Sequence, residues 1–249
     1  MRRIITLITD FGTADGYVAE MKGVLLSGAP DATVVDLTHD IAPQDVEAAR
    51  LALARSWQRF PEGTVHLVIV DPGVGSSRAA LAVRSRERFL LGPDNGVLSP
   101  AFLSGGADVV SLPIPPRASP TFHGRDVFAP AAVRLAAGET LEHLGVLKTD
   151  AVVRRTPDVK RREDGALTGS VIIVDRFGNL VTNIGARLGG IVQFGGAEIA
   201  VRRTYSDVAE GETVALAGSS GFIEIAVRGG SAAQKLSARR GDPVVWKAS

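Results

Sequence analysis

The spacing of apolar residues changes once along the chain, near residue 155. Before that point, short apolar runs alternate with stretches in which apolar residues recur every three or four positions. The runs predict strands and the stretches predict helices, at residues 4–9, 17–26, 32–37, 43–60, 65–70, 79–83, 88–91, 108–112 and 127–138. This alternation is typical of an α/β domain with a central, mostly parallel sheet.

After a polar and charged stretch at 154–164, the chain contains only short strand patterns. These apolar or alternating runs are separated by glycine-containing turns, and they lie at 167–174, 180–184, 198–202, 213–217, 222–227 and 244–246. Short strands at this spacing predict a small barrel or sandwich. We therefore expect an α/β N-terminal domain over residues 1–160 and a smaller all-β, barrel-like C-terminal domain over residues 161–249.

Composition and charge favour a small molecule as the partner. The formal net charge is +1, from 28 basic and 27 acidic residues, so no overall field attracts nucleic acid or an anionic membrane. The basic run at 160–162 has no interleaved aromatic residues and is interpreted as a solvated linker. The absence of cysteine excludes disulfides and thiolate chemistry. With no signal-peptide pattern and no apolar run near the ~20 residues that cross a bilayer, we expect a cytoplasmic protein without membrane contact.

The strongest chemical signal follows the strand predicted at 65–70. This strand ends in Asp71, and Pro72, Gly73 and Gly75 then favour a turn that directs Arg78 back toward the carboxylate. Ligands of open α/β sheets bind where strands end in this way. An Asp–Arg pair taken alone more often closes a loop, so both interpretations stay open at this point.

Other polar residues occupy comparable places. Asp10 ends the first predicted strand, and His123 lies on a loop directly before a predicted helix. His39, in the turn after the second strand, is interpreted as structural, and Arg125 and Asp126 as a local ion pair. The sequence has neither the Gly-x-Gly-x-x-Gly fingerprint nor a Walker lysine loop. Its four histidines are scattered, so we expect no metal site.

Six pieces of the sequence, taken together, resemble one protein family. They lie at 9–12 with 15–18, 36–39 with 43–46, 70–75, 92–96, 122–126 and 175–183. In this order they resemble the S-adenosylmethionine (SAM) hydroxide adenosyltransferases, adenosine-forming SAM hydrolases that are related to the SAM-dependent fluorinase and chlorinase. The resemblance spans both predicted domains and implies hydrolysis of SAM to adenosine and L-methionine.

The resemblance implies that Asp71, Arg78 and His123 are catalytic and handle the attacking water. The halogenating relatives lack this trio. The fluorinase also has an insertion after the Arg78 region and a serine where this chain has Gly124. A SAM-dependent halogenase is therefore a disfavoured alternative. A non-catalytic SAM or adenosine sensor is another alternative, although a sensor has no need for the trio.

The resemblance also implies a substrate-binding set from both domains. Asp10 receives the ribose hydroxyls, Asp175 and Asn179 hold the methionine and adenosine ends, and Ser219 and Ser220 contact the methionine carboxylate. The implied substrate-binding residues are Asp10, Phe11, Asp175, Asn179, Ser219, Ser220, Phe222 and Ala226. Because the fluorinase has arginine where Ser220 aligns, carboxylate recognition here must rest on hydroxyls and backbone amides. Family members are trimers with the site between the first domain of one subunit and the second domain of its neighbour.

The implied chemistry needs no metal and no other cofactor. A sulfonium is already a good leaving group, so the enzyme must hold water in line with the ribose 5′ carbon and assist the loss of its proton. Arg78 is expected to keep Asp71 ionised, which makes Asp71 a weak base whose role is to orient water or the imidazole. Whether Asp71 or His123 accepts the proton stays open.

Overall fold

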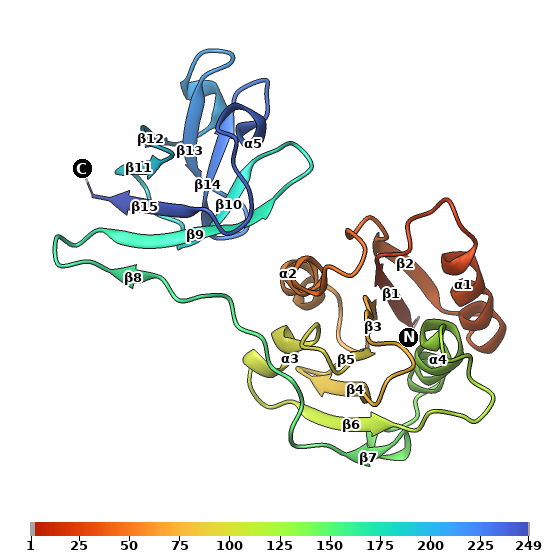
Figure 1. Cartoon of the computed structure of the whole chain (residues 1–249). Coiled ribbons are helices and arrows are strands. Elements are labelled where there is room, and N and C mark those ends of the chain that lie inside the picture. Colours follow the sequence, from red (N-terminus) through yellow and green to blue (C-terminus); the bar gives the residue numbers. More distant parts are fainter. Residues whose placement is uncertain (1–2, 249) are drawn as a thin grey trace. The chain divides into compact units, whose positions relative to one another are not determined.

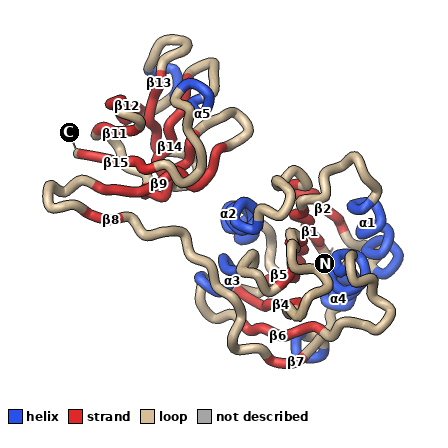
Figure 2. The backbone as a smooth tube through the Cα atoms, viewed as in Figure 1, coloured by secondary structure: helices blue, strands red, loops and turns tan. Residues whose placement is uncertain are grey.

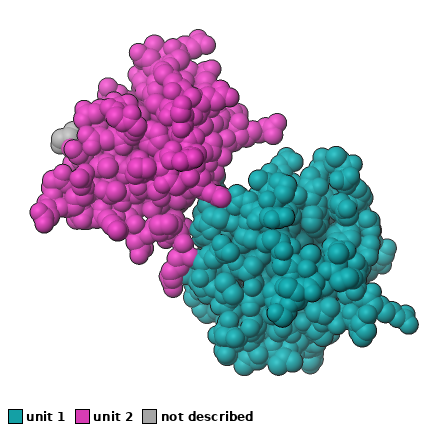
Figure 3. Space-filling model, viewed as in Figure 1, with its two compact units in different colours: residues 1–154 teal, residues 155–249 magenta. Residues whose placement is uncertain are grey.

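The computed structural model describes residues 3–248, and the chain divides into two units between Arg154 and Arg155 (Figure 3). Each unit has its own hydrophobic core and is described separately below. Among the described residues, no helix is both long enough and apolar enough to cross a membrane.

The first unit is built on a mixed sheet, which in the described residues has the strand order β2-β1-β3-β5-β4-β6-β7 (Figure 1). The strands are β1 Ile4–Thr9, β2 Thr33–Thr38, β3 Val65–Ile69, β4 Ala80–Ser85, β5 Arg88–Pro93, β6 Asp108–Leu112 and β7 Val146–Leu147. Strands β2, β1, β3 and β5 are parallel, whereas β4, β6 and β7 pair antiparallel. The α/β prediction is confirmed, with a sheet that is only partly parallel.

The turn between β4 and β5 explains this mixture. Only Arg86 and Glu87 separate the two strands, and both have positive φ, at 46° and 55°. Positive φ at both central residues is the mark of a tight hairpin turn. Two residues cannot form the long crossover that parallel neighbours need, so β4 and β5 must run antiparallel. Neither residue is a glycine or asparagine, which is why the sequence pattern did not reveal the hairpin.

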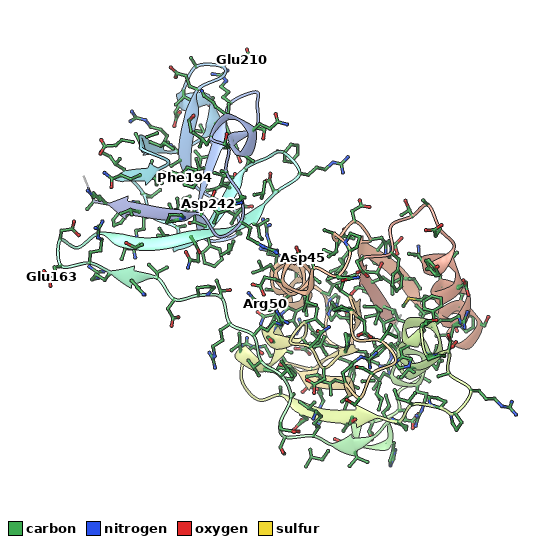
Figure 4. All side chains as sticks on the ribbon, in the orientation of Figure 1. Asp45, Arg50, Glu163, Phe194, Glu210 and Asp242 are labelled. Carbon is green, nitrogen blue, oxygen red and sulfur yellow. The ribbon has the colours of Figure 1, made fainter. Side chains whose placement is uncertain are left out.

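Helices cover both faces of this sheet (Figures 1 and 2). Their bounds are α1 Tyr17–Gly28, α2 Val46–Ser56, α3 Ser99–Leu103 and α4 Ala129–Ala136, with short helical turns at Trp57–Arg59, Gly124–Phe128 and Leu141–His143. Helices α1 and α4 pack together on one face, and α2 and α3 on the other. Helix α2 begins after Asp45, whose Oδ1 accepts a 2.9 Å hydrogen bond from the Ala48 amide (Figure 4).

The second unit is a closed barrel. Its strands are β9 Leu167–Val174, β10 Leu180–Gly185, β11 Ile191–Phe194, β12 Ala197–Arg202, β13 Thr213–Ala217, β14 Phe222–Val227 and β15 Pro243–Lys247. Within the described residues, the order β10-β14-β13-β12-β11-β15-β9 is closed by pairing of β9 with β10. The predicted C-terminal barrel is therefore confirmed. The basic run expected to be a linker instead contributes the exposed edge strand β8, Lys160–Arg161, which pairs with β9.

The two faces of β14 have different surroundings, and this matters for the site. Ile223, Ile225 and Val227 belong to the barrel core. Because successive side chains of a strand point to opposite faces, Glu224 and Ala226 lie on the outer face of the barrel. There Ala226 packs with Val214, Leu216 and Val208, so this outer face is itself covered. The segment that covers it includes the helical turn Tyr205–Asp207, and helix α5, Ala232–Lys235, follows β14.

Candidate active site

Asp71 and Arg78 lie on the loop that follows β3. The Asp71 carbonyl accepts from the Val74 amide at 3.2 Å, which turns the chain directly after the strand. Gly75 has a φ of 79°, and any side chain there would place its Cβ 2.5 Å from the Pro120 carbonyl oxygen. A glycine is therefore required where this loop packs against the segment that leads to His123. That packing brings together residues that lie 45 positions apart in the sequence.

Arg78 joins the other two members of the trio. Its Nε donates to Asp71 Oδ1 at 3.0 Å, and its Nη2 donates to Asp71 Oδ2. The same Nη2 lies 2.9 Å from His123 Nδ1. The Asp71 and Arg78 side chains are only 7% and 10% exposed, and His123 is buried. The three predicted catalytic residues thus form one contiguous cluster with the guanidinium in the middle, so Arg78 rather than Asp71 orients the imidazole.

The contact with Arg78 fixes the protonation of His123. A guanidinium can only donate, so Nδ1 must accept, and the proton of the neutral imidazole then sits on Nε2. Burial lowers the pKa of His123 below its usual value, the positive charge of Arg78 lowers it further, and Asp71 and Asp126 oppose this shift only in part. His123 is therefore a neutral Nε2–H donor at neutral pH.

Asp10 leaves the same edge of the sheet as Asp71. Strands β1 and β3 are parallel neighbours in which Thr9 pairs with Ile69, so Asp10 lies one residue and Asp71 two residues past neighbouring strand ends. One carboxylate oxygen of Asp10, Oδ2, accepts a 2.7 Å hydrogen bond from the Gln44 amide. Gln44 has a φ of 67°, a conformation that costs energy for a non-glycine residue. The backbone amide of this strained residue thus holds the Asp10 carboxylate in one orientation.

His39 braces the turn that carries Asp10. Its Nδ1 lies 2.8 Å from Thr9 Oγ1, which also accepts from the Phe11 amide at 3.3 Å. The backbone carbonyl of His39 accepts a hydrogen bond from the Gly12 amide at 2.9 Å. Its Nε2 lies 3.1 Å from Asp36 Oδ1, an electrostatic contact. The side chain and the backbone of His39 therefore both restrain residues on either side of Asp10.

An aromatic cluster connects the Asp10 turn to the His123 loop. Phe11, Tyr17 and Phe122 pack with ring centroids 5.4–5.8 Å apart, in tilted or edge-to-face arrangements. The guanidinium of Arg125 lies 4.9 Å from the Phe122 ring centroid and pairs with Asp126 and Glu20. The ion pair expected for Arg125 and Asp126 is present. Sequence reasoning singled out Phe11 but missed Tyr17 and Phe122, although both flank predicted site loops.

In the second unit, Asp175 and Asn179 lie in the loop between β9 and β10. Asp175 Oδ1 accepts from the amides of Phe177 and Asn179 at 2.9 and 2.8 Å, and its Oδ2 accepts from Asn179 Nδ2 at 3.0 Å. The two predicted residues thus bond to each other and shape the loop. Phe177 lies between them and is 76% exposed. Sequence reasoning did not single out this aromatic residue.

Ser219 and Ser220 occupy the turn between β13 and β14. Ser220 Oγ is buried and has no hydrogen-bond partner in the part of the chain that the structure describes. Phe222 is half-buried at the start of β14. Ala226 is fully buried in the outer apolar cluster, which leaves its side chain no surface to offer a ligand.

Comparison with known proteins extends this picture to the whole chain. Residues 5–145 match the SAM hydroxide adenosyltransferase N-terminal domain, and residues 169–245 match the C-terminal domain of the same family. The chain belongs to the SAM hydroxide adenosyltransferase family.

Relatives in and near this family include both hydrolases and fluorinases. The (R)-S-adenosyl-L-methionine hydrolases of Thermus thermophilus and Salinispora arenicola are 42% and 41% identical, covering 97% and 96% of this chain and 98% and 95% of the relatives. The fluorinase of Nocardia brasiliensis is 31% identical over 99% of this chain and 97% of its own.

Solved structures match the fold over its full length. An uncharacterised conserved protein from Thermotoga maritima has a TM-score of 0.88 at 33% identity, covering 99% of both chains. A conserved hypothetical protein from Thermus thermophilus has a TM-score of 0.83 at 41% identity, covering 99% of this chain and 100% of the other. The two-unit architecture of this family member is thus shared along the entire chain.

Proposed function

We propose that this protein hydrolyses SAM to adenosine and L-methionine by in-line attack of water on the ribose 5′ carbon. The observation that carries the proposal is the buried cluster of Asp71, Arg78 and His123, in which residues from two loops converge beside Asp10. Two further facts support a hydrolase rather than a halogenase: the hydrolase relatives are more similar in sequence, and Gly124 offers no hydroxyl for a halide.

The chemistry follows from the leaving group. Methionine departs from the sulfonium as a neutral thioether, so the reaction requires neither a general acid nor a metal to activate it. Water forms the new C–O bond as the C–S bond breaks, and the attached water oxygen then loses one proton to become the 5′-hydroxyl of adenosine. The protein's contribution is to align the water and to receive that proton.

We assign the role of proton acceptor to Asp71. His123 Nδ1 already accepts from Arg78 and its Nε2 carries a proton, so the imidazole has no free lone pair for water. An ionised carboxylate keeps further acceptor positions on both oxygens even while Arg78 occupies one on each. Although Asp71 is a weak base, the attacking water becomes strongly acidic as it bonds to carbon, so late proton transfer to a weak base is favourable. His123 holds the water oxygen with its Nε2–H.

The remaining predicted residues would hold the substrate. Asp10 receives the ribose hydroxyls, with Phe11 beside it, and Asp175, Asn179, Ser219, Ser220 and Phe222 line the methionine and adenosine ends. The side chain of Ala226, expected to join them, is fully buried and is left out of this set. As the family resemblance implies, we further propose a homotrimer in which the first unit of one subunit and the second unit of its neighbour share a substrate. Light scattering tests this: we expect three times the chain mass of 26.1 kDa, and a monomeric active enzyme would contradict it.

The names of the hydrolase relatives specify the (R) form of the substrate. The L-methionine part and the ribose have fixed configurations, so (R) designates the sulfonium sulfur. We propose that this protein shares that preference. Inverting the sulfur exchanges the directions of its substituents, and only one arrangement places the leaving group in line with water held at the trio.

Incubation of the purified protein with each sulfonium epimer of SAM tests the function. We expect adenosine and methionine in equal amounts, faster from the (R) epimer, and no loss of activity after treatment with a chelator. Binding of SAM without turnover would support the sensor instead. Formation of a 5′-halo-5′-deoxyadenosine in chloride or fluoride would support the halogenase. A parallel incubation with the Asp71→Asn variant serves as the control and measures the spontaneous decay of SAM.

A further inference from the structure

Glu224 is a buried carboxylate on β14 that the roles given above do not use. The side chain lies on the outer face of the barrel, in the same row as Phe222 and Ala226, because residues two apart in a strand share a face. It is only 7% exposed. A buried carboxylate is costly unless its oxygens are paired, so its partners indicate its purpose.

Within the part of the chain that the structure describes, one of the two carboxylate oxygens of Glu224 has a partner. Oε1 accepts a 2.7 Å hydrogen bond from the Tyr205 hydroxyl. Among the described residues, no hydrogen bond or ion pair involves Oε2. Oε2 instead lies against Gly218, where any side chain would place its Cβ 3.0 Å from this oxygen. The first residue of the β13–β14 turn is therefore kept small beside an open carboxylate oxygen.

The same turn contains Ser220 Oγ, a polar atom that is buried and without a hydrogen-bond partner in the described chain. The turn is closed by bonds from the Gly218 amide to the Phe222 carbonyl and from the Gly221 amide to the Gly218 carbonyl. No backbone acceptor is found in the described residues for the amides of Ser219 and Ser220. Successive amides without a backbone acceptor, beside a hydroxyl, are donors that suit an anion.

Tyr205 orients Glu224 and remains a donor. Burial raises the pKa of the Tyr205 hydroxyl to about 12, with further contributions from the negative charges of Glu224 and Asp175. The influence of Asp175 also shows that this predicted substrate-binding residue lies near the Tyr205–Glu224 pair. The hydroxyl therefore stays protonated and donates its hydrogen to Oε1.

A turn with one open anion and one hydroxyl beside free amides is complementary to a zwitterion. We propose that Glu224 Oε2 binds the α-ammonium group of the methionine half of the substrate, beside the serines that the family resemblance already assigns to its α-carboxylate. This rests on the proposed function, since it names the part of SAM that this turn recognises. Glu224 is thus a specificity-determining residue that selects an amino acid attached to the sulfonium.

The test is Glu224→Gln, with Tyr205→Phe as its matched control. The glutamine keeps the shape of the side chain and removes the charge, whereas the phenylalanine removes the hydrogen bond to Oε1 and leaves the charge. By calorimetry we expect Glu224→Gln to weaken binding of L-methionine about tenfold or more and to leave the adenosine dissociation constant within twofold. A tenfold change corresponds to about 1.4 kcal/mol. In hydrolysis assays the change should fall on KM rather than kcat.

If Glu224 served only to hold Tyr205, the two variants would lose thermal stability together and bind methionine equally well. That result overturns the proposal, as does an unchanged methionine dissociation constant in Glu224→Gln. A SAM analogue without the α-amino group provides a second measure. The parent protein should bind this analogue more weakly than it binds SAM. The Glu224→Gln variant and the parent should bind the analogue with equal dissociation constants. Because these readouts are binding constants, a protein that failed to hydrolyse SAM would refute the proposed function without deciding this proposal.

Discussion

The polar side chains of the site are arranged differently in the two units. In the first unit, Asp71, Arg78 and His123 bond to one another, and Asp10 is fixed by a backbone amide. In the second unit, Ser220 Oγ is buried without a partner in the described residues, and Glu224 has one open oxygen. The first arrangement is complete without a ligand, whereas the second leaves hydrogen-bonding capacity for one.

This difference separates two tasks. Groups that act on a reacting centre must already be in place when the substrate arrives, because reorganisation during the reaction raises the barrier. Groups that select a charged ligand can remain open, since the ligand itself supplies the missing partner. We therefore expect substitutions in the first unit's trio to change kcat, and substitutions at the second unit's turn to change binding.

The largest effect is expected from Asp71→Asn. The amide keeps the size of the side chain and can still accept from Arg78, but it removes the charge and the proton acceptor. We expect kcat to fall by about 10²–10⁴-fold, as for a positioned acid–base group, with KM changed much less. Steady-state kinetics with (R)-SAM measures both constants. If the variant hydrolysed SAM at the parental rate, the trio would be a structural clamp and the division of tasks would fail.

A second prediction locates the pH sensitivity of folding in the first unit, which contains all four histidines. His66 is fully buried on β3, and burial, with a smaller effect of Arg88, lowers its pKa to about 3. The unfolded chain therefore binds a proton below pH 6.5 that the folded state resists, and stability falls with pH from about 6.5 toward 3. The expected loss from His66 is about 3 kcal/mol at pH 4.

Urea unfolding at pH 7.5, 5.5 and 4 measures this loss. His66→Gln should flatten the pH dependence whatever its effect on stability at pH 7.5, whereas the exposed His143→Gln should leave the slope unchanged. A slope that is the same in His66→Gln and the parent would show that another group is responsible.

Asp10→Asn sharpens the comparison within the first unit. Asp10 is held in place by its surroundings but acts on the ribose, which SAM and adenosine share. We expect the dissociation constants of both ligands to rise together, by roughly tenfold for the loss of a charged hydrogen-bond acceptor, with little change in kcat. Calorimetric titration with each ligand tests this. Weakened binding of SAM alone would place Asp10 at the methionine end instead.

The smallest effect is expected from a matched pair of threonines on β1. Thr6 and Thr9 each place Oγ1 within 2.8 Å of a buried histidine Nδ1, from His66 and His39 respectively. Only the Thr9 contact supports the Asp10 turn. Thr9→Val should therefore raise KM by about threefold, and Thr6→Val should lower stability without changing KM. Equal KM values for the two variants would limit the role of His39 to folding.

The sequence pattern predicted most of the elements because their periodicity is local. The bounds of β6, β9, β13 and β14 coincide with the predicted runs. Five short elements, α3, β7, β8, β11 and α5, were missed, since a few residues cannot establish a period.

The site was less accessible from the sequence, because its geometry depends on packing between distant loops. The turn chemistry after β3 was enough to suggest that Arg78 faces Asp71, but the contact between Arg78 and His123 requires the packing of Gly75 against Pro120. Only the family resemblance brought His123 into the trio. Glu224 was missed because an acidic residue that alternates with apolar ones in a strand resembles a solvent-facing position. Its burial depends on the segment around Tyr205, which no local pattern predicts.

The helical turn Gly124–Phe128 directly after His123 is a π-helix, in which the Ala129 amide bonds to the Gly124 carbonyl five residues earlier. It therefore holds one residue more than an α-helical turn of the same height. Deleting any one residue from this turn would convert it to an α-helical turn. The preceding segment, which includes His123, would then rotate by about 100° around the helix axis. This rotation would carry the imidazole away from Arg78. The chemistry thus depends on the length of this turn as well as on its composition. A related chain that is one residue shorter here has lost the trio, even if its aspartate, arginine and histidine remain.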